Sequence, residues 1–129
     1  MSLDLKMLLW SAVLTVLLAF PYTLGLIGKL GLPTLAGNRE NFPAVEGWIG
    51  RALRAHRNML ENLAPFAVLV VVAHLTAKTN ATTALGAQIF FWARVAHAGL
   101  YVGGLPWART GAYAVSLVGM VLILSQLIR

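Results

Sequence analysis

Four long apolar segments, separated by short stretches rich in residues that break helices, constrain the fold of this chain more than any other feature. The segments span residues 3–28, 46–77, 83–104 and 107–128. A membrane-spanning helix needs about 20 predominantly apolar residues, and each segment is long enough. A soluble domain of this length has too little interior volume to bury so much apolar surface. The sequence therefore predicts an integral membrane protein that crosses the bilayer four times.

The composition supports this prediction. Hydrophobic residues make up 59% of the 129-residue chain, charged residues only 11%, and the mean hydropathy is +0.77. Soluble domains carry about 25% charged residues. The first segment lacks a small-residue cleavage site after its apolar run, so we interpret it as a helix and not as a secretory signal peptide. We predict an all-α fold, a membrane four-helix bundle that forms one domain over residues 1–129.

The charge distribution predicts an orientation in the membrane and excludes some functions. Residues 29–46, which we expect to form a loop, and the front of the second segment hold half of the ten lysines and arginines. Because basic residues favour the cytoplasmic side, we place this loop and the turn after the third segment in the cytoplasm. The basic residues form no continuous patch, which argues against nucleic-acid binding. The chain has no cysteine, so any thiol chemistry needs a bound molecule that brings the thiol.

A polar stripe enters the apolar second segment. Its residues follow helical spacing at i, i+3, i+4 and i+7: Arg54, Arg57, Asn58 and Glu61. Such a stripe is either a helix end that reaches to the membrane surface or a binding site. We interpret Arg54, and Arg51 one turn before it, as surface contacts. We assign the deeper residues to a site.

The third and fourth segments bring further polar residues to the same end. Arg94, His97 and Tyr101 share one helical face, and Arg109, Thr110 and Tyr113 follow the next turn. Charged groups inside membrane spans usually face a protein interior or a wet cavity. Only four acids are available to pair with them, so surplus arginine predicts an anionic ligand. Two structural alternatives stay open: Glu61 as an ion-pair partner of Arg94 or Arg57, and His97 as a core histidine.

These motifs resemble the pattern of the MAPEG family, the membrane-associated proteins in eicosanoid and glutathione metabolism. The second segment carries the first motif, Arg54-Ala55-His56-Arg57-Asn58 followed by Glu61 and Pro65. The later segments carry the second, with Arg94, His97 and Tyr101 and then Arg109, Thr110 and Tyr113. The resemblance covers essentially the whole chain. It is close to the microsomal glutathione transferases and their bacterial relatives, which would place the chain in an inner or plasma membrane.

The resemblance implies a homotrimer that binds glutathione between neighbouring subunits near the cytoplasmic face. By matching positions, it implies a set of glutathione-binding residues: Lys29, Arg57, Asn58, Glu61, Arg94, His97, Arg109, Thr110 and Tyr113. Lys29 stands where the family usually has an arginine. The catalytic roles fall to Arg109, which would stabilise the thiolate of glutathione, and to Tyr101, which would donate a hydrogen bond.

The leading functional prediction is a glutathione transferase, with peroxidase activity on lipid hydroperoxides as a second possibility. Its other substrate would be a lipophilic small molecule that reaches the site from the membrane lipids. Two alternatives remain open. One is a catalytically silent member with the same fold that binds lipid. The other is a small proton-coupled exporter, although such a protein usually needs a carboxylate embedded in the membrane and only Glu61 is placed for that role.

Overall fold

Helices make up almost all of the computed structural model, which describes residues 1–40 and 42–129. Four of the helices in these residues are long, one is short, and no strand occurs among them. The long helices are α1 (Leu3–Leu30), α3 (Gly47–Leu75), α4 (Ala81–Val102) and α5 (Pro106–Leu127). Each lies within a few residues of one of the four predicted segments.

The short helix α2 (Leu32–Ala36) falls inside the stretch that we predicted to be a loop. Gly31, with a φ of 84°, ends α1, and Pro33 occupies the first turn of α2, where its missing N–H costs nothing. Leu35 is buried with Leu26 and Ile49, so tertiary contact holds the helix in place. A five-residue helix is too short to show a hydrophobic period, which is why the sequence pattern did not predict it.

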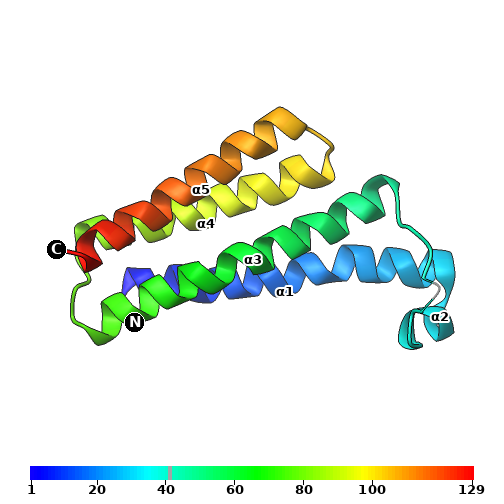
Figure 1. Cartoon of the computed structure of the whole chain (residues 1–129), viewed down its shortest axis with the longest axis horizontal. Helices are drawn as coiled ribbons and strands as arrows, with labels where there is room; N and C mark the ends of the chain where they lie inside the picture. Colours follow the sequence, from blue (N-terminus) through cyan, green and yellow to red (C-terminus); the bar gives the residue numbers. More distant parts are fainter. Residues whose placement is uncertain (41) are drawn as a thin grey trace.

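The long helices run antiparallel in two hairpins (Figure 1). Helix α1 packs on α3 and α4, and α4 packs most extensively on α5. Both termini and the α3–α4 connection lie at one end, which we call the terminal end. Helix α2, the α1–α3 connection and the α4–α5 turn lie at the other, which we call the α2 end. The antiparallel order therefore brings the front of α3, the end of α4 and the start of α5 together.

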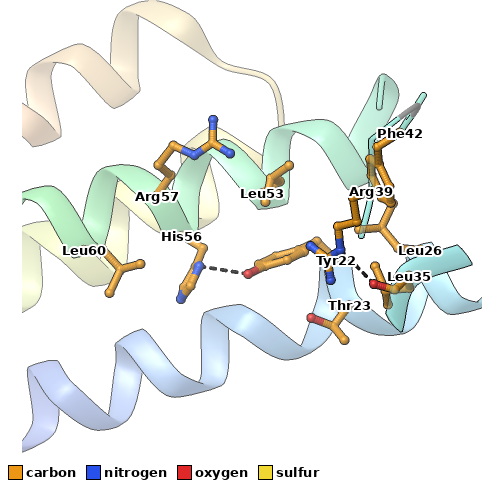
Figure 2. A pocket seen from close by; sticks show the side chains of 10 residues that line it. All are labelled: Tyr22, Thr23, Leu26, Leu35, Arg39, Phe42, Leu53, His56, Arg57 and Leu60. Carbon is orange, nitrogen blue, oxygen red and sulfur yellow. Dashed lines mark hydrogen bonds between the residues drawn. The ribbon is translucent and has the colours of Figure 1, made fainter. Parts of the chain in front are cut away.

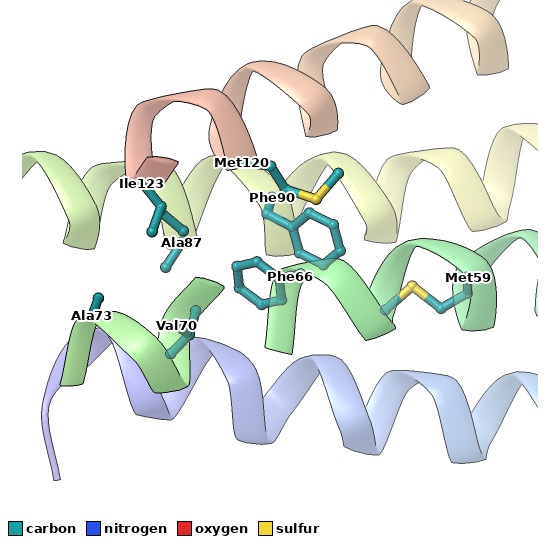
Figure 3. Close-up of a cluster of buried hydrophobic side chains, with 8 residues drawn as sticks. All are labelled: Met59, Phe66, Val70, Ala73, Ala87, Phe90, Met120 and Ile123. Atoms are coloured by element: carbon teal, nitrogen blue, oxygen red, sulfur yellow. The ribbon is translucent and has the colours of Figure 1, made fainter. Parts of the chain in front are cut away.

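The apolar core lies between the two hairpins (Figure 3). Phe66 of α3 stacks on Phe90 of α4 with ring centres 3.8 Å apart, and both side chains are fully buried. Val70 and Ala73 continue the α3 face, and Ile123 closes it from α5. These positions follow the spacing of one helical face, so the core depends on the same period that predicted the helices.

Two glycines allow α4 and α5 to approach closely. A Cβ atom at Gly86 would lie 2.5 Å from the carbonyl oxygen of Gly119, and one at Gly119 would lie 2.5 Å from the carbonyl oxygen of Gly86. Neither position has room for a side chain. Small residues at a crossing are a common way for helices to pack tightly in membranes, where no hydrophobic effect drives helices together.

Three of the helices, α1, α3 and α5, are long and apolar enough to cross a membrane. Helix α4 is not among them, because small alanines and the polar residues Gln88, Arg94 and His97 dilute its apolar character. It is nevertheless as long as α5 and lies alongside it. Many of its polar side chains are buried against the other helices, so its composition suits contact with protein.

Candidate functional site

The polar stripe of α3 faces in two directions. Arg54, Arg57 and Glu61 are exposed in the single chain, whereas Asn58 is half-buried and turns toward α4. The difference arises because residues one apart on a helix point about 100° away from each other. The charged members of the stripe are therefore open to a ligand or a neighbouring chain, whereas Asn58 also contacts the interior through Arg94.

A direct hydrogen bond joins the interior part of the stripe to α4. Arg94 is 1% exposed, and its Nη2 donates to Oδ1 of Asn58 at 2.7 Å. The other two guanidinium nitrogens, Nε and Nη1, are buried and have no hydrogen-bond partner among the residues that the structure describes. Arg94 therefore does not bond to Glu61, which is exposed, and the ion pair considered as one alternative from the sequence is absent from this structure.

Aromatic rings organise the end of α4 against the start of α5. The guanidinium carbon of Arg109 lies 4.2 Å from the ring centre of Tyr101, which is a cation–π contact. The ring of His97 meets Tyr101 edge-on with centres 5.5 Å apart, and His97 is 3% exposed. Arg109 is half-buried and one side of its guanidinium is covered by the ring, so its orientation is defined before any ligand arrives.

Two adjoining hollows form around these groups. The first, of about 240 Å³, is lined by Asn58, His97, Tyr101, Arg109, Thr110 and Tyr113. The second, of about 250 Å³, is lined by Arg54, Arg57, Asn58, Glu61 and Tyr101. Asn58 and Tyr101 line both hollows, so we treat the two as parts of one site. We call the first the inner hollow and the second the outer hollow. Three arginines and one carboxylate around one site suit a ligand with carboxylates and an amine.

A further cavity of about 430 Å³ lies between α3, α1 and the segment around α2, and Arg57 lines both this cavity and the outer hollow. Tyr22 and His56 point toward each other across it, with the tyrosine oxygen 3.0 Å from Nδ1 of the histidine (Figure 2). Arg39 also lines it and donates from Nε to the carbonyl oxygen of Leu35 at 2.7 Å. Neither Tyr22 nor Arg39 was predicted to belong to a site, because only tertiary contact brings α1 and the segment around α2 to this face of α3.

The structure brings together eight of the ten residues that the sequence analysis assigned to the site. The eight that line the two hollows are Arg57, Asn58, Glu61, His97, Tyr101, Arg109, Thr110 and Tyr113. Arg94 lies behind Asn58 and lines neither hollow. Lys29 is exposed in the last turn of α1 and also lines neither hollow of its own chain.

Of the two outer arginines of α3, Arg51 differs from the surface contact that we expected, and Arg54 agrees with it in part. Arg51 is half-buried and donates from Nε to the carbonyl oxygen of Val102 at 2.9 Å. That carbonyl lies in the last turn of α4, where helical partners are missing, so Arg51 joins α3 to the end of α4. Arg54 is exposed, as expected, but it also lines the outer hollow. Arg54 lies one helical turn before Arg57, and this spacing could have predicted that Arg54 belongs to the site.

Comparison with known proteins decides the family. The model of the MAPEG family matches residues 7–129, nearly the whole chain. The chain belongs to the MAPEG family. With three helices that are able to span a bilayer, it is an integral membrane protein of the glutathione and eicosanoid metabolism type. No individual curated protein matches the chain. The predicted resemblance to MAPEG proteins is thereby confirmed.

Proposed function

We propose that this MAPEG protein is a glutathione transferase that joins the sulfur of glutathione to lipophilic electrophiles. The observation that carries the proposal is the pair of adjoining hollows, in which Arg57 and Glu61 lie on one side and Arg109 on the other. Members of this family are associated with glutathione. The charges of the two hollows match the charges of that tripeptide group by group.

Binding would use opposite ends of glutathione in different ways. The molecule has two carboxylates and one amine at neutral pH. Arg54 and Arg57 offer planar guanidinium groups to the carboxylates, and Glu61 offers a carboxylate to the amine. The outer hollow would hold the charged ends of glutathione. The cysteine in the middle of the tripeptide would then extend into the inner hollow.

Arg109 would then activate the thiol. A free thiol has a pKa of about 8.5, and a guanidinium beside the sulfur favours the thiolate. Arginine keeps its own proton, so its role is electrostatic. The proton of the thiol leaves to water, the thiolate sulfur bonds to the electrophilic carbon, and the leaving group departs with its bonding electrons. The hydroxyl of Tyr101 is placed in the same hollow to donate a hydrogen bond to the sulfur.

We further propose a homotrimer with α3 at the interface between subunits. In the single chain, the exposed face of α3 continues from Arg57 and Glu61 to Val68, Val72 and Leu75 at helical spacing. A shallow, wholly apolar cavity of about 290 Å³ lies on this face. A neighbouring copy would cover the apolar part and complete the outer hollow. Native mass spectrometry in detergent tests this: a monomer at all concentrations would contradict the trimer.

The deciding experiment is calorimetric titration of the detergent-solubilised protein with glutathione. We expect saturable binding, and a higher melting temperature with glutathione present. A ligand at a hundred times its dissociation constant stabilises the folded state by about 2.7 kcal/mol. Arg57→Ala and Arg109→Ala should weaken the binding heat without unfolding the protein. If saturating glutathione neither binds nor stabilises the protein while lipid co-purifies with it, the silent lipid-binding alternative is correct.

A further inference from the structure

We propose that Arg94 and Asn62 act as positioning residues that hold the Asn58 amide with its NH₂ group toward the site. The part of the ligand that meets Asn58 must then be a hydrogen-bond acceptor, such as a carbonyl or carboxylate oxygen. This inference rests on the proposed function for the identity of the ligand, but the orientation of the amide follows from the chain's own contacts.

The chemistry of Arg94 fixes the orientation of the Asn58 amide. A guanidinium has only donors, so the Asn58 atom that faces Nη2 at 2.7 Å has to be the oxygen. Turning the amide over would place its NH₂ against a buried N–H group and would leave Arg94 with three unbonded nitrogens, since Nε and Nη1 already lack partners. Because an unpartnered buried charge is costly, Arg94 allows only one orientation of Asn58.

Asn62 reinforces the same orientation from within α3. It lies one turn after Asn58 and is 7% exposed. Its Nδ2 donates to the backbone carbonyl of Asn58 at 2.9 Å and approaches the side-chain Oδ1 at 3.4 Å. Two donors on two elements therefore converge on the Asn58 oxygen. The remaining hydrogen-bonding group of this side chain, its NH₂, is left for whatever occupies the hollows that Asn58 lines.

Thr110, which also lines the inner hollow, has the complementary hydrogen-bonding character. The Thr110 hydroxyl donates to the carbonyl oxygen of Pro106 at 2.9 Å, so its hydrogen is already used. What Thr110 offers to a ligand is an acceptor. Asn58 and Thr110 line the same hollow, one with a donor and the other with an acceptor. For glutathione, a carbonyl or carboxylate oxygen would face Asn58, and an N–H group would face Thr110.

The orientation is tested first without ligand, by melting temperature. Asn58→Asp keeps an oxygen toward Arg94 and gives it a charge partner. We expect this variant to be at least as stable as the wild type, and the gain to vanish in an Arg94→Met background. Equal destabilisation by Asn58→Asp in both backgrounds would overturn the proposal, whether or not glutathione binds.

The consequence for binding is tested with glutathione by calorimetry and steady-state kinetics. Arg94→Met frees the amide to rotate and should weaken glutathione binding about tenfold, the effect of losing one hydrogen bond to a charged group. Arg94→Lys, which keeps a donor cation, should restore most of the affinity. Asn62→Leu should raise KM for glutathione with little change in kcat, because it alters binding and not the reacting atoms.

Asn58→Asp is also expected to bind glutathione at least tenfold more weakly, because the NH₂ donor is replaced by an oxygen. High salt separates the causes: it would restore affinity if charge repulsion alone were responsible, and would not restore a lost donor. Wild-type protein that does not bind glutathione contradicts the proposed function. Wild-type protein that binds, with Arg94→Met and Asn62→Leu binding equally well, contradicts the positioning role.

Discussion

Arg109 lies against Tyr101, with its guanidinium carbon 4.2 Å from the centre of the tyrosine ring. The two residues come from α5 and α4, on either side of the turn at the α2 end. The ring covers one side of the cation and leaves the other edge toward the inner hollow, which both residues line. Preorganised charge of this kind is the usual basis of electrostatic catalysis, since it needs no rearrangement when the reaction begins.

Replacing Arg109 with alanine should lower the fraction of bound glutathione that is ionised by about tenfold or more, because the cation beside the sulfur is lost. The measurement is the ultraviolet absorbance of the thiolate on addition of glutathione. Arg129→Ala, which removes an arginine at the terminal end, is the control and should leave the signal unchanged. A normal thiolate signal in Arg109→Ala would show that another group activates the thiol.

The ring and the hydroxyl of Tyr101 should have separable effects. Tyr101→Phe keeps the ring under Arg109, so glutathione affinity should stay within about threefold while kcat falls. Tyr101→Leu removes the ring as well and should weaken binding too, by about 0.5–1 kcal/mol. Binding and turnover are measured on both variants. Equal behaviour of the two would mean that the cation–π contact does not position Arg109.

The outer hollow should hold the charged ends of glutathione. Arg57→Ala should weaken glutathione binding by about 1.5–3 kcal/mol, the range for hydrogen bonds to charged groups. Glu61→Gln should weaken it as well and should lose selectivity for glutathione over an analogue without the amine. Calorimetric titration with both ligands measures this. If Glu61→Gln distinguishes the two ligands as strongly as the wild type does, Glu61 does not contact the amine.

Two glycines of α4, one at the crossing with α5 and one away from it, allow a matched test of helix packing. Gly86→Ala would place a Cβ 2.5 Å from the carbonyl oxygen of Gly119, whereas Gly99→Ala meets nothing within 4 Å. We expect Gly86→Ala to cost about 1–3 kcal/mol of stability through overpacking. Gly99→Ala should stabilise by up to about 1 kcal/mol through helix propensity. The melting temperatures of the two variants are compared in detergent. Equal melting temperatures would mean that α4 and α5 move apart at little cost to accommodate the extra Cβ.

The orientation in the membrane can be tested because the chain has no cysteine of its own. We expect four spans with the α2 end in the cytoplasm, as the basic residues predict. A single cysteine in Asn38→Cys should then react with a membrane-impermeant maleimide only after the cells are opened. Thr79→Cys, at the terminal end, should react in intact cells. The reverse pattern would mean that the topology is inverted. Labelling of both positions in intact cells would mean that α3, the long helix between them, does not cross the membrane.

Helical spacing was enough to group most of the site residues, whereas the family was predicted from the resemblance of the motifs to those of MAPEG proteins. Arg57, Asn58 and Glu61 share a helical face, and His97 and Tyr101 share another, so the period of 3.6 residues was enough to group them. The antiparallel order of the helices then placed both groups at one end. Spacing could not separate Asn58, which lines the site, from Arg94 behind it, because depth within a site depends on how two helices pack.

The sequence by itself determined that this chain is a membrane protein of helices with a polar, arginine-rich end, because hydropathy and helical period are local properties. Only the tertiary structure decided the contacts between elements. It decided that Arg51 joins α3 to the end of α4, that Gly86 meets Gly119, and that Arg94 donates to the side-chain oxygen of Asn58. Each of these depends on the distance and rotation between two packed helices, and neither quantity is encoded in the period of one helix.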